Sequence, residues 1–248
     1  MIISFYYNNY YKEREFEFFM KVKRNVVELI VPYEGKELTF EYPPLKGSYA
    51  VIADQFDDRS LRKSSSSEIA SLVYDAFENS KWQFESEIIK ILNNDFLFEF
   101  AGNLYLPKSK EEINNGVLLE TDPFISNGRI VMDKASLVKR LYENDPLVKF
   151  IPFGYKIGEQ TWQELETNPY MAGRYGLEGA EKMAEIASKY DSNPEIYGYN
   201  DVEKEIINLS ALGTCYNIFQ KLVVNGFSND GKQDFGSGGY GFGVVQKK

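Results

Sequence analysis

The sequence FEFFMKVKRNVVELIVPYEGKELTFEYPP, residues 16–44, carries the clearest structural pattern in this chain. From residue 16 to residue 23, apolar side chains alternate with mostly polar ones, which is the period-two pattern of a half-buried β-strand. Residues 24–25, Arg-Asn, can turn the chain. The apolar run at residues 26–31 then predicts a second strand beside the first.

The next turn and strand extend this pattern. Residues 34–35, Glu-Gly, form another turn signal, and apolar residues alternate with polar ones over residues 38–42. The two prolines at residues 43–44 cannot donate hydrogen bonds to a ladder, so pairing is expected to end there. The stretch therefore predicts an antiparallel β-meander in the N-terminal part of the chain.

Beyond the meander, helices and strands are expected to be interspersed. Ser65 or Ser66 is expected to cap a helix, with Glu68 completing a capping box ahead of an apolar stripe at three- and four-residue spacing. The other expected helices cover residues 82–92, 134–144, 161–165, 179–190 and 202–212. The other expected strands cover residues 49–53, 96–106, 117–120, 129–132, 147–153 and 216–224, with 117–120 pairing with 129–132.

This order of elements predicts an α+β fold: an N-terminal antiparallel β-meander followed by mixed helices and strands. We expect one domain over residues 1–235, with a possible division into a β-rich part, 1–60, and a mixed part, 61–235. Residues 236–248 are glycine-rich and predict a C-terminal tail or a last strand. Their match to a dinucleotide-binding glycine pattern is rejected, because the few residues after it do not begin a helix.

The composition excludes several kinds of chemistry. The 248 residues include no histidine and a single cysteine, Cys215, which excludes zinc sites made of nitrogen and sulfur ligands and catalytic triads that need an imidazole. The net charge of −9 disfavours nucleic acid as a partner, because a chain that neutralises phosphates usually carries a basic face. No cofactor is expected, except Mg²⁺ or Mn²⁺ under the alternative function given below.

We expect a cytoplasmic protein without membrane contact. The first residues lack the basic end and apolar run of a secretory signal. No apolar run approaches the roughly 18 residues needed to cross a bilayer. A single cysteine also leaves no intramolecular disulfide.

Three aspartates, Asp54, Asp57 and Asp58, are the candidate metal ligands. They are expected to follow a strand and precede a helix, a place where carboxylates often hold Mg²⁺ or Mn²⁺. The basic residues Arg59, Arg62 and Lys63 lie close by and could contact a phosphate. The alternative interpretation is an ordinary solvated turn between two elements.

Two loops rich in aromatic residues and glycine are the candidate binding surface. They cover residues 150–159 and 168–176, and loops of this composition are typical of binding surfaces. The expected rim residues are Tyr155, Lys156, Tyr170, Arg174 and Tyr175. The alternative interpretation is a pair of turns covered by aromatic rings.

Two functions follow from these patterns. The leading hypothesis is a non-enzymatic binding or assembly protein with an aromatic-rich interaction surface, which associates with itself or with a protein partner. It rests on the 36 tyrosine and phenylalanine residues and on the absence of recognisable catalytic motifs. The alternative is a nuclease-like phosphoester hydrolase that depends on Mg²⁺ or Mn²⁺ and uses the three aspartates.

Overall fold

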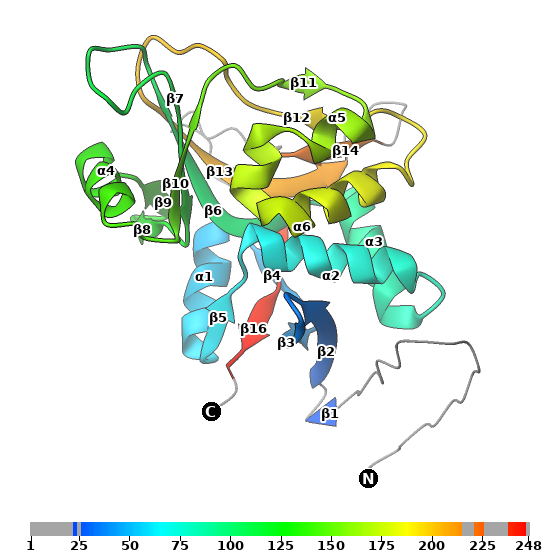
Figure 1. Ribbon diagram of the computed structural model, residues 1–248. Coiled ribbons are helices and arrows are strands. Elements are labelled where there is room, and N and C mark those ends of the chain that lie inside the picture. Colours follow the sequence, from blue (N-terminus) through cyan, green and yellow to red (C-terminus); the bar gives the residue numbers. More distant parts are fainter. Residues whose placement is uncertain (1–21, 24–25, 215–220, 226–237, 247–248) are drawn as a thin grey trace.

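The computed structural model describes residues 22–23, 26–214, 221–225 and 238–246, and it has the α+β fold that the sequence predicts (Figure 1). The helices are α1 (Tyr49–Asp58), α2 (Ser66–Glu78), α3 (Gln83–Asn94), α4 (Lys134–Tyr142), α5 (Trp162–Glu166) and α6 (Pro169–Ala187). The strands are β1 (Val22–Lys23), β2 (Val26–Tyr33), β3 (Lys36–Tyr42), β4 (Leu45–Gly47), β5 (Leu61–Lys63), β6 (Leu97–Leu106), β7 (Gly116–Thr121), β8 (Phe124–Ser126), β9 (Arg129–Val131), β10 (Val148–Pro152), β11 (Gly158–Glu159), β12 (Glu195–Ile196), β13 (Ile206–Thr214), β14 (Leu222–Val224), β15 (Gly239–Gly241) and β16 (Gly243–Val245).

The first sheet contains the predicted meander and has the strand order β1-β2-β3-β16-β5. Strands β2 and β3 pair antiparallel around Glu34 and Gly35, whose φ angles of 48° and 72° fit a tight hairpin turn. Strand β1 pairs antiparallel with β2, and the rest of the first predicted strand lies outside the described residues. The antiparallel N-terminal sheet is therefore confirmed.

The second sheet is built around β6. Its order is β10-β7-β6-β13-β14-β12-β11, with β15 pairing with β6 and β4 beside it. All ten residues of β6 are buried, and β7 and β13 lie antiparallel on its two sides. Strand β10 is an edge strand in which Val148 alone is fully buried, so the strand predicted at residues 147–153 is present but less buried than expected.

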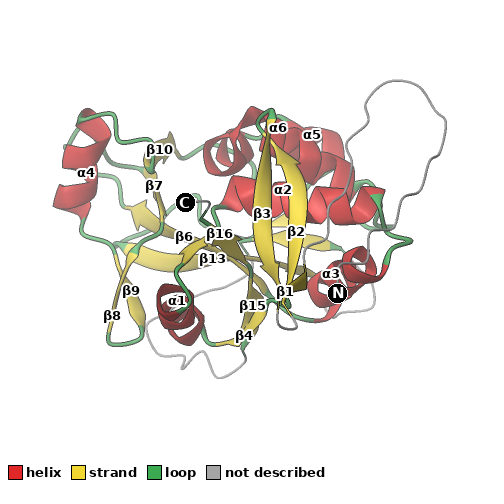
Figure 2. Cartoon of the chain, turned by 90° about the horizontal axis from the view of Figure 1, so that it is seen from below, coloured by secondary structure: helices red, strands yellow, loops and turns green. Residues whose placement is uncertain are grey.

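Two hydrophobic clusters lie on opposite faces of β6. Leu97 and Tyr105 pack with α2, α3 and α6 in one cluster, whereas Phe98 and Phe100 pack with α1 and α4 in the other. Figure 1 shows the first group of helices on one side of the large sheet and α4 beyond its far edge. Seen from below, β2 and β3 lie in front of α2 (Figure 2), which carries the first cluster into the smaller sheet.

Several predicted helix starts are confirmed. Ser65 accepts a hydrogen bond from the Glu68 backbone, and the Glu68 side chain completes the capping box of α2. Thr161 and Glu164 form the same motif at α5. These caps supply partners for backbone N–H groups that the first turn leaves unpaired.

The strand predicted at residues 49–53 is wrong, because this segment is the first part of α1. Tyr49, Ile52, Ala53 and Phe56 are all buried at helical spacing. The Ser48 hydroxyl accepts a hydrogen bond from the Val51 backbone at 3.4 Å. The apolar run was too short to separate strand from helix, and Phe56 is the residue whose spacing identifies the helix.

The loop predicted at residues 168–176 is also wrong, because α6 begins at Pro169 rather than near Gly179. Asn168 caps the helix and proline occupies its first turn, where the missing N–H has no cost. At Gly176, φ and ψ of 75° and 171° interrupt the helix. That break explains why only the part of α6 after Gly176 shows a regular helical pattern in the sequence.

Two further predictions in the large sheet are wrong. Residues 202–212 were expected to be helical, but β13 runs through most of this segment as a strand buried between β6 and β14. A strand buried on both faces loses the alternation that distinguishes it from a helix. In addition, β7 pairs with β6 and β10, whereas β9 pairs with β8, so residues 117–120 and 129–132 are not partners.

The glycine-rich end of the chain contributes one short strand to each sheet. Strand β15 lies beside β4 and β6 in the second sheet, and β16 lies between β3 and β5 in the first. Phe242, between them, is fully buried and meets Phe40 edge to face with ring centroids 6.2 Å apart. Of the segment 236–248, residues 239–241 and 243–245 are thus strands. None of the helices within the described ranges is long and apolar enough to span a membrane.

Replacing Phe242 by alanine should lower the free energy of unfolding by about 3–5 kcal/mol, because it leaves a cavity where the two sheets meet. Urea unfolding followed by circular dichroism measures this. Val51→Ala, at an exposed position on α1, is the control and should change stability by less than about 0.5 kcal/mol. A loss below about 1 kcal/mol for Phe242→Ala would contradict the packing described here.

Candidate functional site

The aromatic residues predicted at the rim of a binding surface are mostly interior. The buried side chains are Tyr155, Tyr170, Arg174 and Tyr175. Of the five predicted residues, Lys156 is exposed, with its ammonium 2.7 Å from the Glu164 carboxylate. The structure therefore brings four of the residues together, but places them beneath the surface rather than at a rim.

The first turns of α6 position this group over β6. Tyr170 and Arg174 are four residues apart and so lie on one face of the helix. The Tyr155 ring stacks on Tyr170 with centroids 5.3 Å apart. The Arg174 guanidinium carbon lies 5.8 Å from the centroid of the Tyr170 ring. These contacts are typical of an ordered interior rather than of a mobile loop.

Asn103 of β6 is the centre of a buried hydrogen-bond network. Its Oδ1 accepts from the Tyr170 hydroxyl at 2.9 Å and from Arg174 Nη2. Its Nδ2 donates to Asn225 Oδ1 at 2.8 Å, and Asn225 Nδ2 donates to the Tyr105 hydroxyl at 3.0 Å. The network links α6, β6 and the end of β14, and full pairing is the condition under which buried amides are stable.

Glu99 supplies the negative charge near the buried Arg174. Burial raises the pKa of the Glu99 carboxyl, while the nearby guanidinium and a hydrogen bond donated by Ser210 lower it. Glu99 adjoins Phe100, whose φ of 42° lies in the left-handed region, at an irregular step in the pairing of β6 with β13. A bulky residue holds this conformation only where packing enforces it.

This interior group is sealed from solvent in the described conformation. Glu99, Asn103 and Tyr170 have no exposed surface, so none of them can touch a substrate there. Several of the group's buried polar atoms have no hydrogen-bond partner among the described residues: Tyr155 Oη, Arg174 Nε, and Asn208 Nδ2 and Oδ1. The arrangement fixes α6 against the sheet, and an accessible site must lie elsewhere.

The three candidate metal ligands lie on α1 rather than in a turn after a strand. Asp54, Asp57 and Asp58 are all exposed, at helical spacing on the outer side of α1. Within the described part of the chain, no group of three or more aspartate, glutamate, cysteine or histidine residues is close enough to hold a metal ion. The helix thus places these carboxylates in water.

Asp75 on α2 is a carboxyl whose ionisation is disfavoured by its surroundings. Burial, together with the nearby Glu85 carboxyl of α3, raises the pKa of Asp75 to about 7, and Lys182 of α6 opposes this shift. Burial also raises the pKa of Glu85. The two carboxyls lie within the helical layer that covers the large sheet, away from any described cavity.

The hairpin formed by β8 and β9 presents an apolar face to solvent. Phe124 is 69% exposed and Val131 is 45% exposed, and the two are direct partners across the strand pair. Direct partners lie on the same face with Cβ atoms about 5 Å apart. Within the described strands, no other pair of directly opposed residues has two large apolar side chains that are both exposed.

The opposite face of the hairpin is anchored in the core. Ile130 is buried in the cluster that contains Phe100, and Ile125 packs partly against it. The Asp122 backbone N–H donates to the Phe100 carbonyl at 2.8 Å, and the Asp122 carboxylate lies 2.8 Å from Lys63 Nζ. Figure 2 shows the hairpin at the periphery, beside α1.

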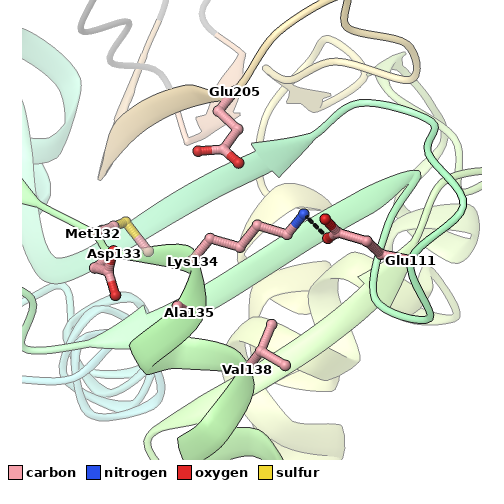
Figure 3. Close-up of a pocket in the computed structure, with 7 residues that line it drawn as sticks. All are labelled: Glu111, Met132, Asp133, Lys134, Ala135, Val138 and Glu205. Atoms are coloured by element: carbon pink, nitrogen blue, oxygen red, sulfur yellow. Dashed lines mark hydrogen bonds and ion pairs between the residues drawn. The ribbon is translucent and has the colours of Figure 1, made fainter.

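An open depression adjoins this hairpin. It has a volume of about 600 Å³, and its lining is Glu111, Met132, Asp133, Lys134, Ala135, Val138 and Glu205. Lys134 forms an ion pair with Glu111, and the Asp133 carboxylate caps α4 by accepting from the Ser136 backbone at 2.8 Å. Figure 3 shows the Glu205 carboxylate pointing toward the Lys134–Glu111 pair from the start of β13.

Sequence reasoning missed this hairpin, although a signal for it was present. Asn127 and Gly128 have φ angles of 51° and 73°, the left-handed values of a two-residue hairpin turn. Asn-Gly between short apolar runs is the strongest local hairpin pattern. The expectation treated residues 122–128 as one connection between longer strands, so Phe124 was not considered as a surface residue.

Comparisons with protein families, curated proteins and solved structures show no match to this chain.

The Asn103 network predicts a large loss of stability when its centre is removed. Asn103→Ala removes the Oδ1 acceptor shared by Tyr170 Oη and Arg174 Nη2 and the Nδ2 donor to Asn225 Oδ1, so the free energy of unfolding should fall by about 3–5 kcal/mol. Tyr170→Phe removes the hydroxyl that donates to Asn103 Oδ1 and accepts from Arg174 Nη2 at 3.4 Å, and should cost about 1–2 kcal/mol. Urea unfolding of both variants checks this, and equal losses would contradict a network centred on Asn103.

The raised pKa of Asp75 predicts a pH-dependent stability. The folded state holds this proton more tightly than the unfolded state, whose pKa is about 3.9. The contribution of Asp75 is thus favourable below about pH 4 and is lost as pH rises toward about 7. Asp75→Asn should therefore be more stable than wild type at pH 8, by about 2 kcal/mol after allowance for solvent, with little difference at pH 4.

Unfolding curves at several pH values between 4 and 8 measure this difference. Asp75→Glu keeps a carboxyl and is the control, because it should keep a pH dependence in the same direction. Parallel pH profiles for wild type and Asp75→Asn would show that the carboxyl is not perturbed.

Proposed function

We propose that this chain is a non-enzymatic binding protein whose interaction surface is the outer face of the β8–β9 hairpin. The observation that supports it is the exposed cross-strand pair of Phe124 and Val131 on an anchored hairpin. Its action is the capture of a protein partner. We place this role in the cytoplasm, since the chain's single cysteine leaves it no intramolecular disulfide.

A partner would gain free energy by binding this face, because the face leaves apolar surface exposed to water. Burial of a phenylalanine or valine side chain contributes about 1.5–3 kcal/mol. A partner that covers Phe124 and Val131 gains much of this burial free energy for each of the two side chains. Single exposed apolar side chains are common on proteins and need no explanation, whereas two opposed on one small sheet form the beginning of a patch.

The anchoring of the hairpin reduces the cost of binding. Ile130 and the Asp122–Lys63 ion pair hold it in place before any partner arrives. Binding to an ordered surface avoids the conformational entropy that a flexible loop loses. This preorganisation distinguishes the hairpin from exposed apolar residues on single helices, such as Leu177 on α6.

The backbone of the hairpin offers a second means of recognition. Strands β8 and β9 form a two-stranded sheet, and no third described strand pairs with either of them. Unpaired edges carry N–H and C=O groups that can pair with an extended segment of another chain. An extended partner could thus combine backbone hydrogen bonds with contacts to Phe124 and Val131.

Photo-crosslinking from the hairpin tests this proposal. With p-benzoylphenylalanine in place of Phe124, irradiation of cells that make the protein should give a discrete crosslinked adduct. The matched control carries the same group in place of Leu177, which is exposed but isolated, and should give no adduct of that size. Light scattering of the purified protein over a wide concentration range then shows whether the adduct contains a second copy.

Phe124→Ser should retain wild-type stability within about 0.5 kcal/mol, because the side chain is exposed, so loss of binding in this variant cannot result from unfolding. The same adducts from both positions, or none from position 124, would contradict the hairpin as the interaction surface.

A further inference from the structure

The depression beside the hairpin has the lining that suits a long basic side chain. Its lining includes the apolar side chains of Met132, Ala135 and Val138. The lining residues come from three separate parts of the chain, as Figure 3 shows. Lysine and arginine carry an apolar stem and a charged head, so they bury the stem on such a surface while the head meets carboxylates.

The residues that line the depression carry more negative than positive charges. The lining carries three carboxylates, on Glu111, Asp133 and Glu205, and one ammonium, on Lys134. Lys134 is already paired with Glu111, and Asp133 is engaged at the start of α4. Glu205, which is exposed and belongs to a different segment, gives the depression an excess of negative charge that a cation would offset.

The lining of the depression begins directly after β9 in the chain. Val131 is followed by Met132 and Asp133, and Asp133 has extended backbone angles, so the apolar face and the Asp133 carboxylate are two residues apart along the chain. An extended segment advances about 3.3 Å per residue and directs every second side chain to the same side. A partner strand on the hairpin can therefore place an apolar residue on Phe124 and a basic residue, two positions away, in the depression.

We infer that the partner segment is a basic, extended peptide of another protein in which apolar and lysine or arginine side chains alternate at every second position, on one face. The inference rests on the proposed function, and it names the chemistry of the partner. A second copy of this chain is disfavoured as the occupant, because each copy carries a net charge of −9 and like-charged molecules repel. Complementary charge also speeds encounter and selects against acidic segments.

Three synthetic peptides serve as the probe in an NMR titration of the full chain. They are acetyl-Lys-Ser-Phe-Ser-Lys-Ser-Phe-amide and its counterparts with glutamine or glutamate in place of lysine. The lysine peptide should bind wild type roughly three- to fivefold more tightly than the glutamine peptide, and the glutamate peptide should bind least. At 1 M salt the three affinities should converge, because exposed charges are screened.

Two variants separate this inference from the proposed function. Glu205→Gln should remove most of the preference for lysine while leaving the glutamine peptide unaffected. Phe124→Ser should weaken all three peptides by a similar factor.

Each outcome decides one of the two proposals. A lysine peptide that binds no more tightly than the glutamine peptide, or a preference that survives in Glu205→Gln, overturns the basic partner while the hairpin surface stands. Insensitivity of all three peptides to Phe124→Ser overturns the hairpin surface itself. Concentration-dependent dimers that Phe124→Ser dissolves would identify the occupant as a second copy and overturn the basic partner.

Discussion

Complete burial of β6 is the constraint on which the rest of the molecule depends. A strand with ten buried residues must pair its backbone groups within the protein, because no water reaches them. Strands β7 and β13 supply this pairing over most of its length, and β15 meets its first residue, Leu97. Both faces must also be covered by apolar side chains, which is why helices pack on both sides of the large sheet.

The same burial explains why Tyr155, Tyr170, Arg174 and Tyr175 lie in the interior. On β6, Glu99 and Asn103 lie on the face that α6 covers, and they can remain there only with polar partners. Arg174 and Tyr170 supply those partners from the first turns of α6. Such networks fix a single arrangement of helix on sheet. The proposed interaction surface lies instead on a peripheral element, the β8–β9 hairpin, which pairs with no other described strand.

Local signals in the sequence were predictive where a few neighbouring residues determine the structure. The capping boxes at Ser65 and Thr161 and the turn at Gly35 involve contacts within four residues, so they can be read without the fold. Prediction failed where burial controls the pattern. The segment at residues 202–212 shows no alternation of apolar and polar residues, because both faces of β13 are covered. Its strand conformation depends on pairing with the neighbouring strand β6 and is not visible in its own sequence.

The sequence by itself determined the fold class, the antiparallel N-terminal sheet and the absence of imidazole, because composition and short-range periodicity are properties of the chain alone. The tertiary structure decided which aromatic residues reach the surface. Tyr170 and Phe124 are both large rings beside turn-forming residues, and their sequence contexts do not separate them. Tyr170 lies on the buried face of α6 and Phe124 on the exposed face of a peripheral hairpin, and that difference arises from contacts between segments far apart in the chain.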